Sequence, residues 1–181
     1  MQNLFSFHGG DVGPWKVVSI KPIVGEGLRD VDRVSIRSEE FDAPMESYWR
    51  LRGVVSNDRY VTHREREGLR SAQPGLGRPE AAWAALIPVR KSPSWWALAQ
   101  DDRRAILEDR SRHIETGMKY LPAIARKLHH SRDLGEPFDF LTWFEFAPGD
   151  SGAFDDLLAF LRASEEWKYV DREVDIRLIR L

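Results

Sequence analysis

The chain has 181 residues, of which 42% are hydrophobic and 31% charged, and its formal net charge is −2. This length allows one large domain or two small, tightly packed ones, and the nearly balanced charge predicts no general attraction to nucleic acid. The absence of cysteine excludes disulfides, zinc–thiolate sites and cysteine nucleophiles, and no apolar stretch approaches the roughly 20 residues of a membrane helix, so we expect a cytoplasmic protein with no membrane partner.

The first half of the chain predicts a small, mostly extended unit. Residues 1–14 are expected to be irregular, because three glycines and a proline punctuate them. Alternating apolar and β-branched residues predict strands over 15–24, 33–37 and 47–56. A capping-box pattern at 62–65 predicts the start of a short, charged helix, and 74–80 is expected to be a loop.

The second half predicts longer elements with clearer periodicity. A strand is expected over 81–91, where apolar residues alternate. A helix is expected to begin near residue 100, to carry His113 and to end before Pro122, which cannot continue it. A second, amphipathic helix is expected to begin at Ser151. Three further strands are predicted over 123–130, 138–146 and 172–180.

The order of these elements predicts the fold class. Strand, helix, strand, strand, helix, strand is the split βαβ order of a ferredoxin-like unit. The first half resembles a shortened unit of the same sort. We therefore predict an α+β fold with two ferredoxin-like units side by side, of the dimeric α+β barrel type. The shortened unit would occupy residues 1–80 and the second unit residues 81–181.

The stretch from His113 to Arg126 holds the most informative pair of polar residues. A helix, a sharp stop and a strand can place an imidazole on one side of a cavity and a guanidinium on the other. Haem needs such a pair, because an axial His holds its iron while a polar group acts on the opposite face. The alternative is a His at a helix-packing surface and an Arg in a salt bridge, and these two residues alone do not decide between them.

Other residues carry weaker signals. His129 and His130 are adjacent on a predicted strand, so their side chains point to opposite faces and cannot chelate one metal; we expect them at the surface or a dimer contact. The segment KSPSWWAL, 91–98, offers a cation, hydroxyls and two tryptophans just before the helix of His113. Such a set suits a porphyrin and its propionates, although the tryptophans could also only fix the loop to the core.

Several stretches together resemble one family. They are RYVTHR around Tyr60, KSPSWW at 91–96, SRHIETGMKYLP, AIARKL and SEEWKYVDRE. Spanning roughly residues 47–181, they are similar to chlorite dismutases of the short, cytoplasmic, dimeric kind, in the wider family that also contains coproheme decarboxylases. The resemblance implies a haem b cofactor and a homodimer.

The resemblance also implies roles for individual residues. His113 would be the proximal ligand of the haem iron, and Arg126 would lie on the distal side above it. A carboxylate would accept a hydrogen bond from the other nitrogen of His113; Glu165 and Glu166 are both candidates, and the spacing in the family favours Glu166. The remaining roles concern the edges of the cofactor: Lys91, Trp95 and Tyr60 would hold the propionates, and Trp96 would line the pocket.

The implied activity is the conversion of chlorite to chloride and dioxygen, with formation of the O–O bond. An anion must enter, and a hypochlorite intermediate must stay close until the bond forms, which suits an arginine. Two alternatives remain. Coproheme decarboxylases use a tyrosine near the reactive propionates, whereas segment 91–98 has tryptophan there and the distal residue is Arg126. A haem-binding protein without turnover is the other alternative.

Overall fold

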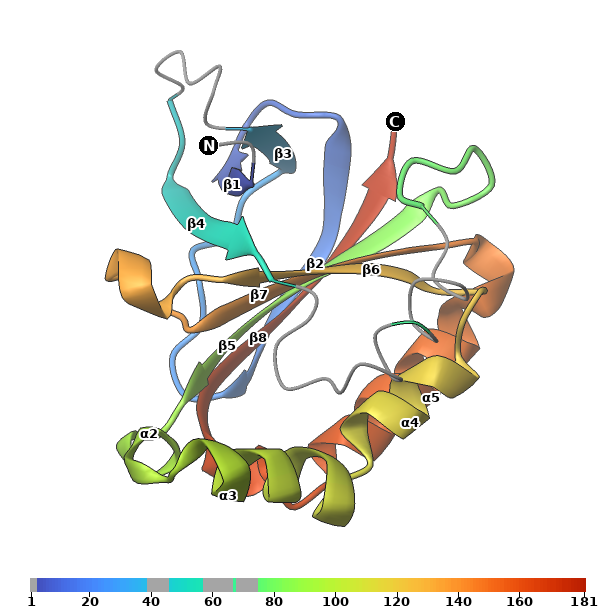
Figure 1. Ribbon diagram of the computed structural model, residues 1–181. Helices are drawn as coiled ribbons and strands as arrows, with labels where there is room; N and C mark the ends of the chain where they lie inside the picture. Colours follow the sequence, from blue (N-terminus) through green and yellow to red (C-terminus); the bar gives the residue numbers. More distant parts are fainter. Residues whose placement is uncertain (1–2, 39–45, 57–66, 68–74) are drawn as a thin grey trace.

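The computed structural model describes residues 3–38, 46–56, 67 and 75–181 (Figure 1). Within these residues eight antiparallel strands form a closed barrel in the order β1-β3-β2-β8-β5-β7-β6-β4. The strands are β1 Leu4–Gly10, β2 Trp15–Val24, β3 Arg33–Ser38, β4 Trp49–Val55, β5 Trp83–Lys91, β6 Ala125–His130, β7 Phe140–Phe146 and β8 Val170–Arg180. The predicted α+β class is confirmed, and the strands of both halves of the chain close into one barrel.

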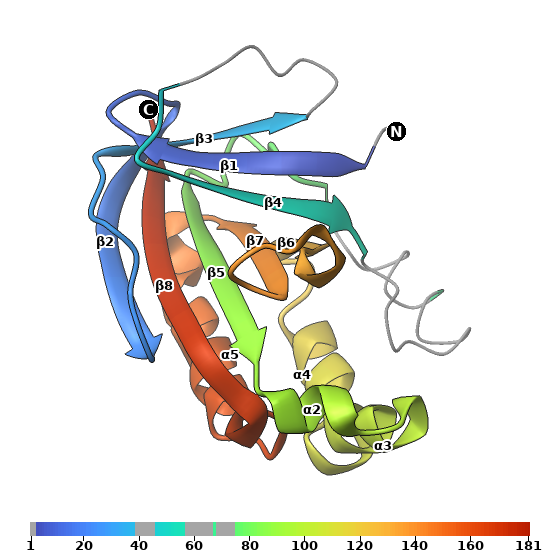
Figure 2. The ribbon, with the colours of Figure 1, turned by 90° about the vertical axis from the view of Figure 1, so that its left-hand side faces the viewer.

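Except for the turn η3 Arg132–Leu134, which lies between β6 and β7, the helices follow β5 and β7, and the α-helices gather on one side of the barrel. The helical elements are α2 Pro93–Ala97, α3 Gln100–Arg104, the π-helix η2 Ala105–Arg110, α4 His113–Lys119, α5 Ser151–Arg162 and the 3-10 turns η3, η4 Pro148–Asp150 and η5 Glu166–Tyr169. In Figures 1 and 2, α2 to α5 lie beside β5–β8 and away from β1, β3 and β4. Within the described residues no helix is long and apolar enough to cross a bilayer.

Both halves of the barrel arrange their four strands in the same order. In the second half the order is β8-β5-β7-β6, and in the first half it is β4-β1-β3-β2. Each half therefore places its fourth strand beside its first, then its third, and its second strand at the far edge. The halves join along a long β2–β8 ladder, and along a short β4–β6 ladder in which Val54 and Val55 face His130 and His129.

The four strands of the second half, β8-β5-β7-β6, form the second sheet, which is buried on both faces. The molecule therefore has two main apolar cores, one on each face of this sheet. Inside the barrel, side chains of both halves pack together, among them Phe7, Leu51, Leu86, Trp143 and Ile176. On the outer face, alternate residues of the second sheet, among them Ile87 and Phe144, pack against Leu157 and Leu161 of helix α5. The period-2 and period-3.6 patterns of the sequence thus correspond to these two interfaces.

Three expectations for local structure need correction. Residues 4–10 form β1 rather than an irregular tail, because Gly9 lets the strand approach the Trp49 ring closely. The helix before Pro122 is broken: after the π-helix η2, Arg112 adopts a left-handed conformation with φ of 50°, and α4 begins at His113. His129 and His130 are both buried rather than exposed. The helix expected from 62–65 starts outside the described residues.

Candidate functional site

An apolar cavity lies between the outer face of the second sheet and the helices that cover it. It contains about 1120 Å³ of empty space when its open mouth is counted. The sheet contributes Ile87, Val89, Lys91, Arg126, Leu128, Phe140, Thr142 and Phe144. The helices and helical turns contribute Trp95, Leu107, His113, Ile114, Gly117, Leu157, Leu158, Leu161, Glu166 and Trp167. Residues far apart in the sequence, including His113 and Arg126, therefore line one cavity.

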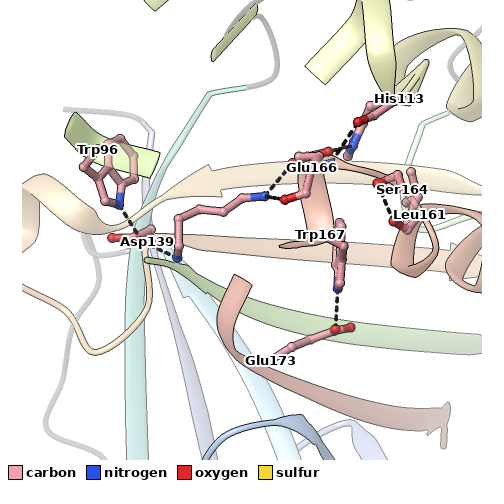
Figure 3. A network of polar contacts seen from close by, with 10 residues as sticks. Trp96, His113, Asp139, Leu161, Ser164, Glu166, Trp167 and Glu173 are labelled. Carbon is pink, nitrogen blue, oxygen red and sulfur yellow. Dashed lines mark hydrogen bonds and ion pairs between the residues drawn. The ribbon is translucent and has the colours of Figure 1, made fainter. Parts of the chain in front are cut away.

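His113 is the first residue of α4 and forms a short hydrogen bond with Glu166. The distance from His113 Nδ1 to Glu166 Oε2 is 2.6 Å (Figure 3). The second oxygen of Glu166, Oε1, accepts a hydrogen bond of 2.7 Å from Lys91 Nζ. Burial alone would raise the pKa of Glu166, but the charges of Lys91 and His113 and their hydrogen bonds hold that pKa well below its usual range. Glu166 is therefore an ionised carboxylate that accepts from both neighbours.

The two adjacent glutamates have different environments. Glu166 is buried at the start of η5, where it contacts His113, as the spacing in the family favoured. Glu165 is more exposed and forms an ion pair of 3.2 Å with Arg110. The side chains diverge because consecutive residues of a helical turn point in different directions.

Lys91, which was expected to hold a propionate, forms a buried ion pair with Glu166. The Lys91 and Glu166 side chains are only 3% and 5% exposed, and the Lys91 ammonium is directed at the Glu166 carboxylate. Its Nζ also lies 4.8 Å from the ring centroid of Trp95 and 5.2 Å from that of Trp167. Two aromatic faces and a carboxylate stabilise the buried charge. Lys91 therefore belongs to the network behind His113, and its expected role at a propionate stays a prediction.

Arg126 reaches the cavity from the sheet side. It lies on β6, opposite Phe144 of β7 in the strand register, and Leu128 and Phe144 line the cavity with it. Arg126 is half-buried: part of its surface opens to the cavity, and protein atoms displace water from the rest. This desolvation lowers the pKa of the Arg126 guanidinium from its very high ordinary value. The group stays charged at neutral pH, because an arginine is deprotonated only at extreme pH.

The two tryptophans of segment 91–98 behave differently. Trp95 is buried and lines the cavity, and its indole Nε1 is a buried donor with no hydrogen-bond partner among the residues that the structure describes. Trp96 was expected to line the pocket, but it lies behind the wall instead: its ring stacks on Phe140, and its Nε1 donates to Asp139 at 3.1 Å (Figure 3). Tyr60, the remaining residue expected near a propionate, lies outside the described residues.

The cavity fits a haem on its chemistry. It offers apolar walls, one imidazole whose Nδ1 is engaged so that Nε2 is left to bind a metal, and the unpartnered buried donor of Trp95 for an anionic edge. In the part of the chain that the structure describes, no three His, Cys, Asp or Glu side chains are grouped to hold a metal ion. A metal carried by a macrocycle needs only one protein ligand.

Sequence reasoning missed the role of Trp167 in this site. Trp167 lines the cavity, faces Lys91, and donates from Nε1 to Glu173 Oε2 at 2.8 Å (Figure 3). It lies within the stretch SEEWKYVDRE, but its position next to Glu166 carried no pattern that distinguished it from a core aromatic. The apolar lining from α5 could be found, because Leu157, Leu158 and Leu161 follow helical spacing.

The model of the chlorite dismutase family matches residues 25–180, so the chain belongs to the chlorite dismutase family. Among solved structures, it is similar to a dimeric chlorite dismutase from Nitrobacter winogradskyi, with 54% identity, coverage of 98% of this chain and 99% of that chain, and a TM-score of 0.91. A chlorite dismutase from Candidatus Nitrospira defluvii in complex with imidazole shares the fold at 19% identity, covering 98% of this chain and 91% of that chain with a TM-score of 0.67.

A curated relative matches a shorter segment. Chlorite dismutase from Ideonella dechloratans is 37% identical over 87 residues, which is 48% of this chain. The match spans only 28% of that protein.

Proposed function

We propose that the protein is a haem b enzyme that converts chlorite to chloride and dioxygen. The observation that carries this proposal is that two unlike groups line one apolar cavity, the carboxylate-bound His113 from α4 and the charged Arg126 from β6. The similarity to a dimeric chlorite dismutase over nearly the whole chain supports it. When bound through His113, haem would supply an iron that exchanges an oxygen atom with chlorite; the protein residues do the rest.

Arg126 would act on the substrate. A guanidinium in an apolar cavity attracts a small anion strongly, because the low dielectric screens the interaction less than water does. It would orient chlorite towards the iron, and then hold the hypochlorite that forms until the O–O bond is made. Phe144 and Leu128 would exclude water from the same space.

Glu166 and Lys91 would set the basicity of His113. An ionised carboxylate at 2.6 Å draws the Nδ1 proton of His113 towards itself, which makes Nε2 a stronger electron donor to a metal. Lys91 keeps Glu166 ionised, so the carboxylate does not take up the proton completely. Trp95 Nε1 would donate to a propionate, Tyr60 would assist there, and Trp96 would support the cavity wall through Phe140.

This role gives a direct prediction for the carboxylate. Glu166→Gln should raise the reduction potential of the bound haem by several tens of millivolts, because a neutral amide no longer draws the proton from His113 and the oxidised iron loses stabilisation. The matched control is Glu165→Gln, which removes the neighbouring carboxylate but should leave the potential unchanged. Spectroelectrochemical titration of both variants measures the effect, and equal shifts would exclude a specific role for Glu166.

We further propose that the chain is organised as two ferredoxin-like units, residues 1–80 and 81–181, in a homodimer. The shared strand order of the two halves supports the first point, and the dimeric relative supports the second.

The test of the activity is oxygen evolution from chlorite by the purified protein loaded with haem. We expect one dioxygen and one chloride per chlorite, and a Soret band of a His-ligated haem before the reaction. Absence of oxygen evolution from a fully loaded protein would overturn the proposal. Conversion of iron coproporphyrin to haem b with hydrogen peroxide, without oxygen from chlorite, would assign the chain to the decarboxylase branch instead.

A further inference from the structure

The turn that precedes α4 connects both members of the His113–Glu166 pair. The π-helix η2 ends at Arg110, and Ser111 and Arg112 lead into α4, with Arg112 in the left-handed conformation that residues other than glycine disfavour. This break makes His113 the first residue of a new helix. The first amides of that helix need acceptors, because they have none within the helix.

Glu108 supplies those acceptors. Its Oε2 accepts a hydrogen bond of 2.8 Å from the amide of Ile114, and its Oε1 accepts one of 3.2 Å from the amide of Glu115. The N-cap residue Arg112 provides no side-chain cap of its own. A carboxylate at this end also interacts favourably with the helix dipole. Glu108 thus fixes the first turn of the helix that carries His113.

Ser111 binds the other member of the pair. Its Oγ accepts a hydrogen bond of 2.9 Å from the backbone amide of Glu166, and both residues are buried. Residues 108–112, the end of η2 and the turn that follows it, therefore hold the backbone at Glu166 on one side and the start of α4 on the other. The 2.6 Å contact between His113 and Glu166 joins residues that are 53 positions apart, so it depends on this placement.

Apolar packing restrains α4 only weakly. Its own small cluster has two buried members, Leu107 and Ile114, with Met118 and Leu121 packed against them. Helix α5, by contrast, buries four large side chains against the sheet. We propose that Glu108 and Ser111 are positioning residues for His113 and Glu166, acting through the helix cap and the Glu166 amide. The effect on bound haem rests on the proposed function; the effect on the pair itself does not.

The test uses the full-length variants Glu108→Gln and Ser111→Ala, each measured without and with haem. The control is Asp109→Asn, which removes an exposed neighbouring carboxylate. Without haem, we expect amide exchange at Ile114 or Glu115 to be about five- to tenfold faster in Glu108→Gln, as for a lost helix cap. In both variants, the far-downfield proton resonance of the His113 Nδ1–H…carboxylate bond should broaden or move upfield, whereas Asp109→Asn should match wild type.

With haem, both variants should shift the reduction potential in the direction of Glu166→Gln and by less. Unchanged amide exchange and an unchanged His113 resonance in both variants would overturn the positioning role. If no variant, including wild type, binds haem, the proposed function fails, while the exchange and resonance measurements still decide the role of Glu108 and Ser111. If Glu108→Gln does not fold, the variant Ser111→Ala, which removes only one hydroxyl, decides the positioning role.

Discussion

The two halves of the barrel share a strand order but differ in what connects the strands. In the second half, helices follow β5 and β7, cover the outer face of the sheet and enclose the cavity. In the first half, the described connections between strands contain no such helices, and no residue of β1 to β4 lines the cavity. The difference teaches that the strands provide the frame, whereas the helical connections enclose the site against the outer face of the second sheet. The following predictions test whether these contributions can be separated.

The largest effect should come from His113, which belongs to the helical layer. His113→Ala should lose haem, or bind it only weakly, because the cavity has no other imidazole among its described lining residues. The fold should be largely kept, since the His113 side chain is about one-third exposed and contributes little to either core. Haem titration followed at the Soret band, with circular dichroism as the control, measures both. Full, tight haem binding with an unchanged spectrum would mean that another residue is the ligand.

The next effect concerns the sheet side of the cavity. Arg126→Ala should keep haem and fold, but lower kcat/KM for chlorite by about one to two orders of magnitude, which corresponds to the loss of a charge-assisted contact. Hypochlorite should escape more often, so the variant should bleach sooner, and methionine as a trap should protect it more than wild type. Oxygen evolution against time, with and without methionine, is the measurement. Equal rates and equal inactivation in the two proteins would make Arg126 a structural residue.

The frame could be predicted from the sequence better than the site's details. Strand β2 was predicted with its observed bounds, because β-branched residues mark 15–24, and α5 was found from its spacing of leucines. Strand β1 was missed, because a glycine that accommodates a distant tryptophan looks in sequence like a turn. The contact between Lys91 and Glu166 could not be predicted for a related reason: nothing in the local sequence shows that a 3-10 turn 75 positions later brings a carboxylate to the Lys91 ammonium. Such contacts depend on tertiary placement.

The short β4–β6 ladder that joins the two halves should lose stability in acid. His129 of β6 is buried against Phe5 and Phe7 of β1, and burial lowers its pKa to about 4. In the unfolded chain this pKa lies near 6.5, so the unfolded state binds more protons between pH 6.5 and 4, and stability should fall as pH falls through this range. The loss attributable to His129 is up to about 3 kcal/mol at pH 4. His129→Gln, which keeps a donor for the Leu141 carbonyl, should flatten the pH dependence of urea unfolding; an equally steep curve would exclude His129 as the cause.

The smallest effect should come from the first half alone, and two adjacent glycines provide a matched pair for measuring it. A Cβ at Gly9 would lie 2.1 Å from the Trp49 ring, whereas a Cβ at Gly10 would meet nothing closer than 3.6 Å. The Trp49 indole cannot easily move aside, because its Nε1 donates to the Arg29 carbonyl at 3.0 Å and its ring is buried in the barrel core. Gly9→Ala should therefore destabilise the fold by about 1–3 kcal/mol, as overpacking does, while Gly10→Ala should change stability by no more than about 0.5 kcal/mol.

Below its unfolding temperature, Gly9→Ala should keep the haem spectrum and the chlorite activity of wild type, because Trp49 lies inside the barrel and the cavity lies outside it. Thermal unfolding and activity at low temperature measure the two quantities separately. A Gly9→Ala protein that is folded but has an altered Soret band would show that strain in the first half reaches the cavity through the shared core, and that frame and site are not separable.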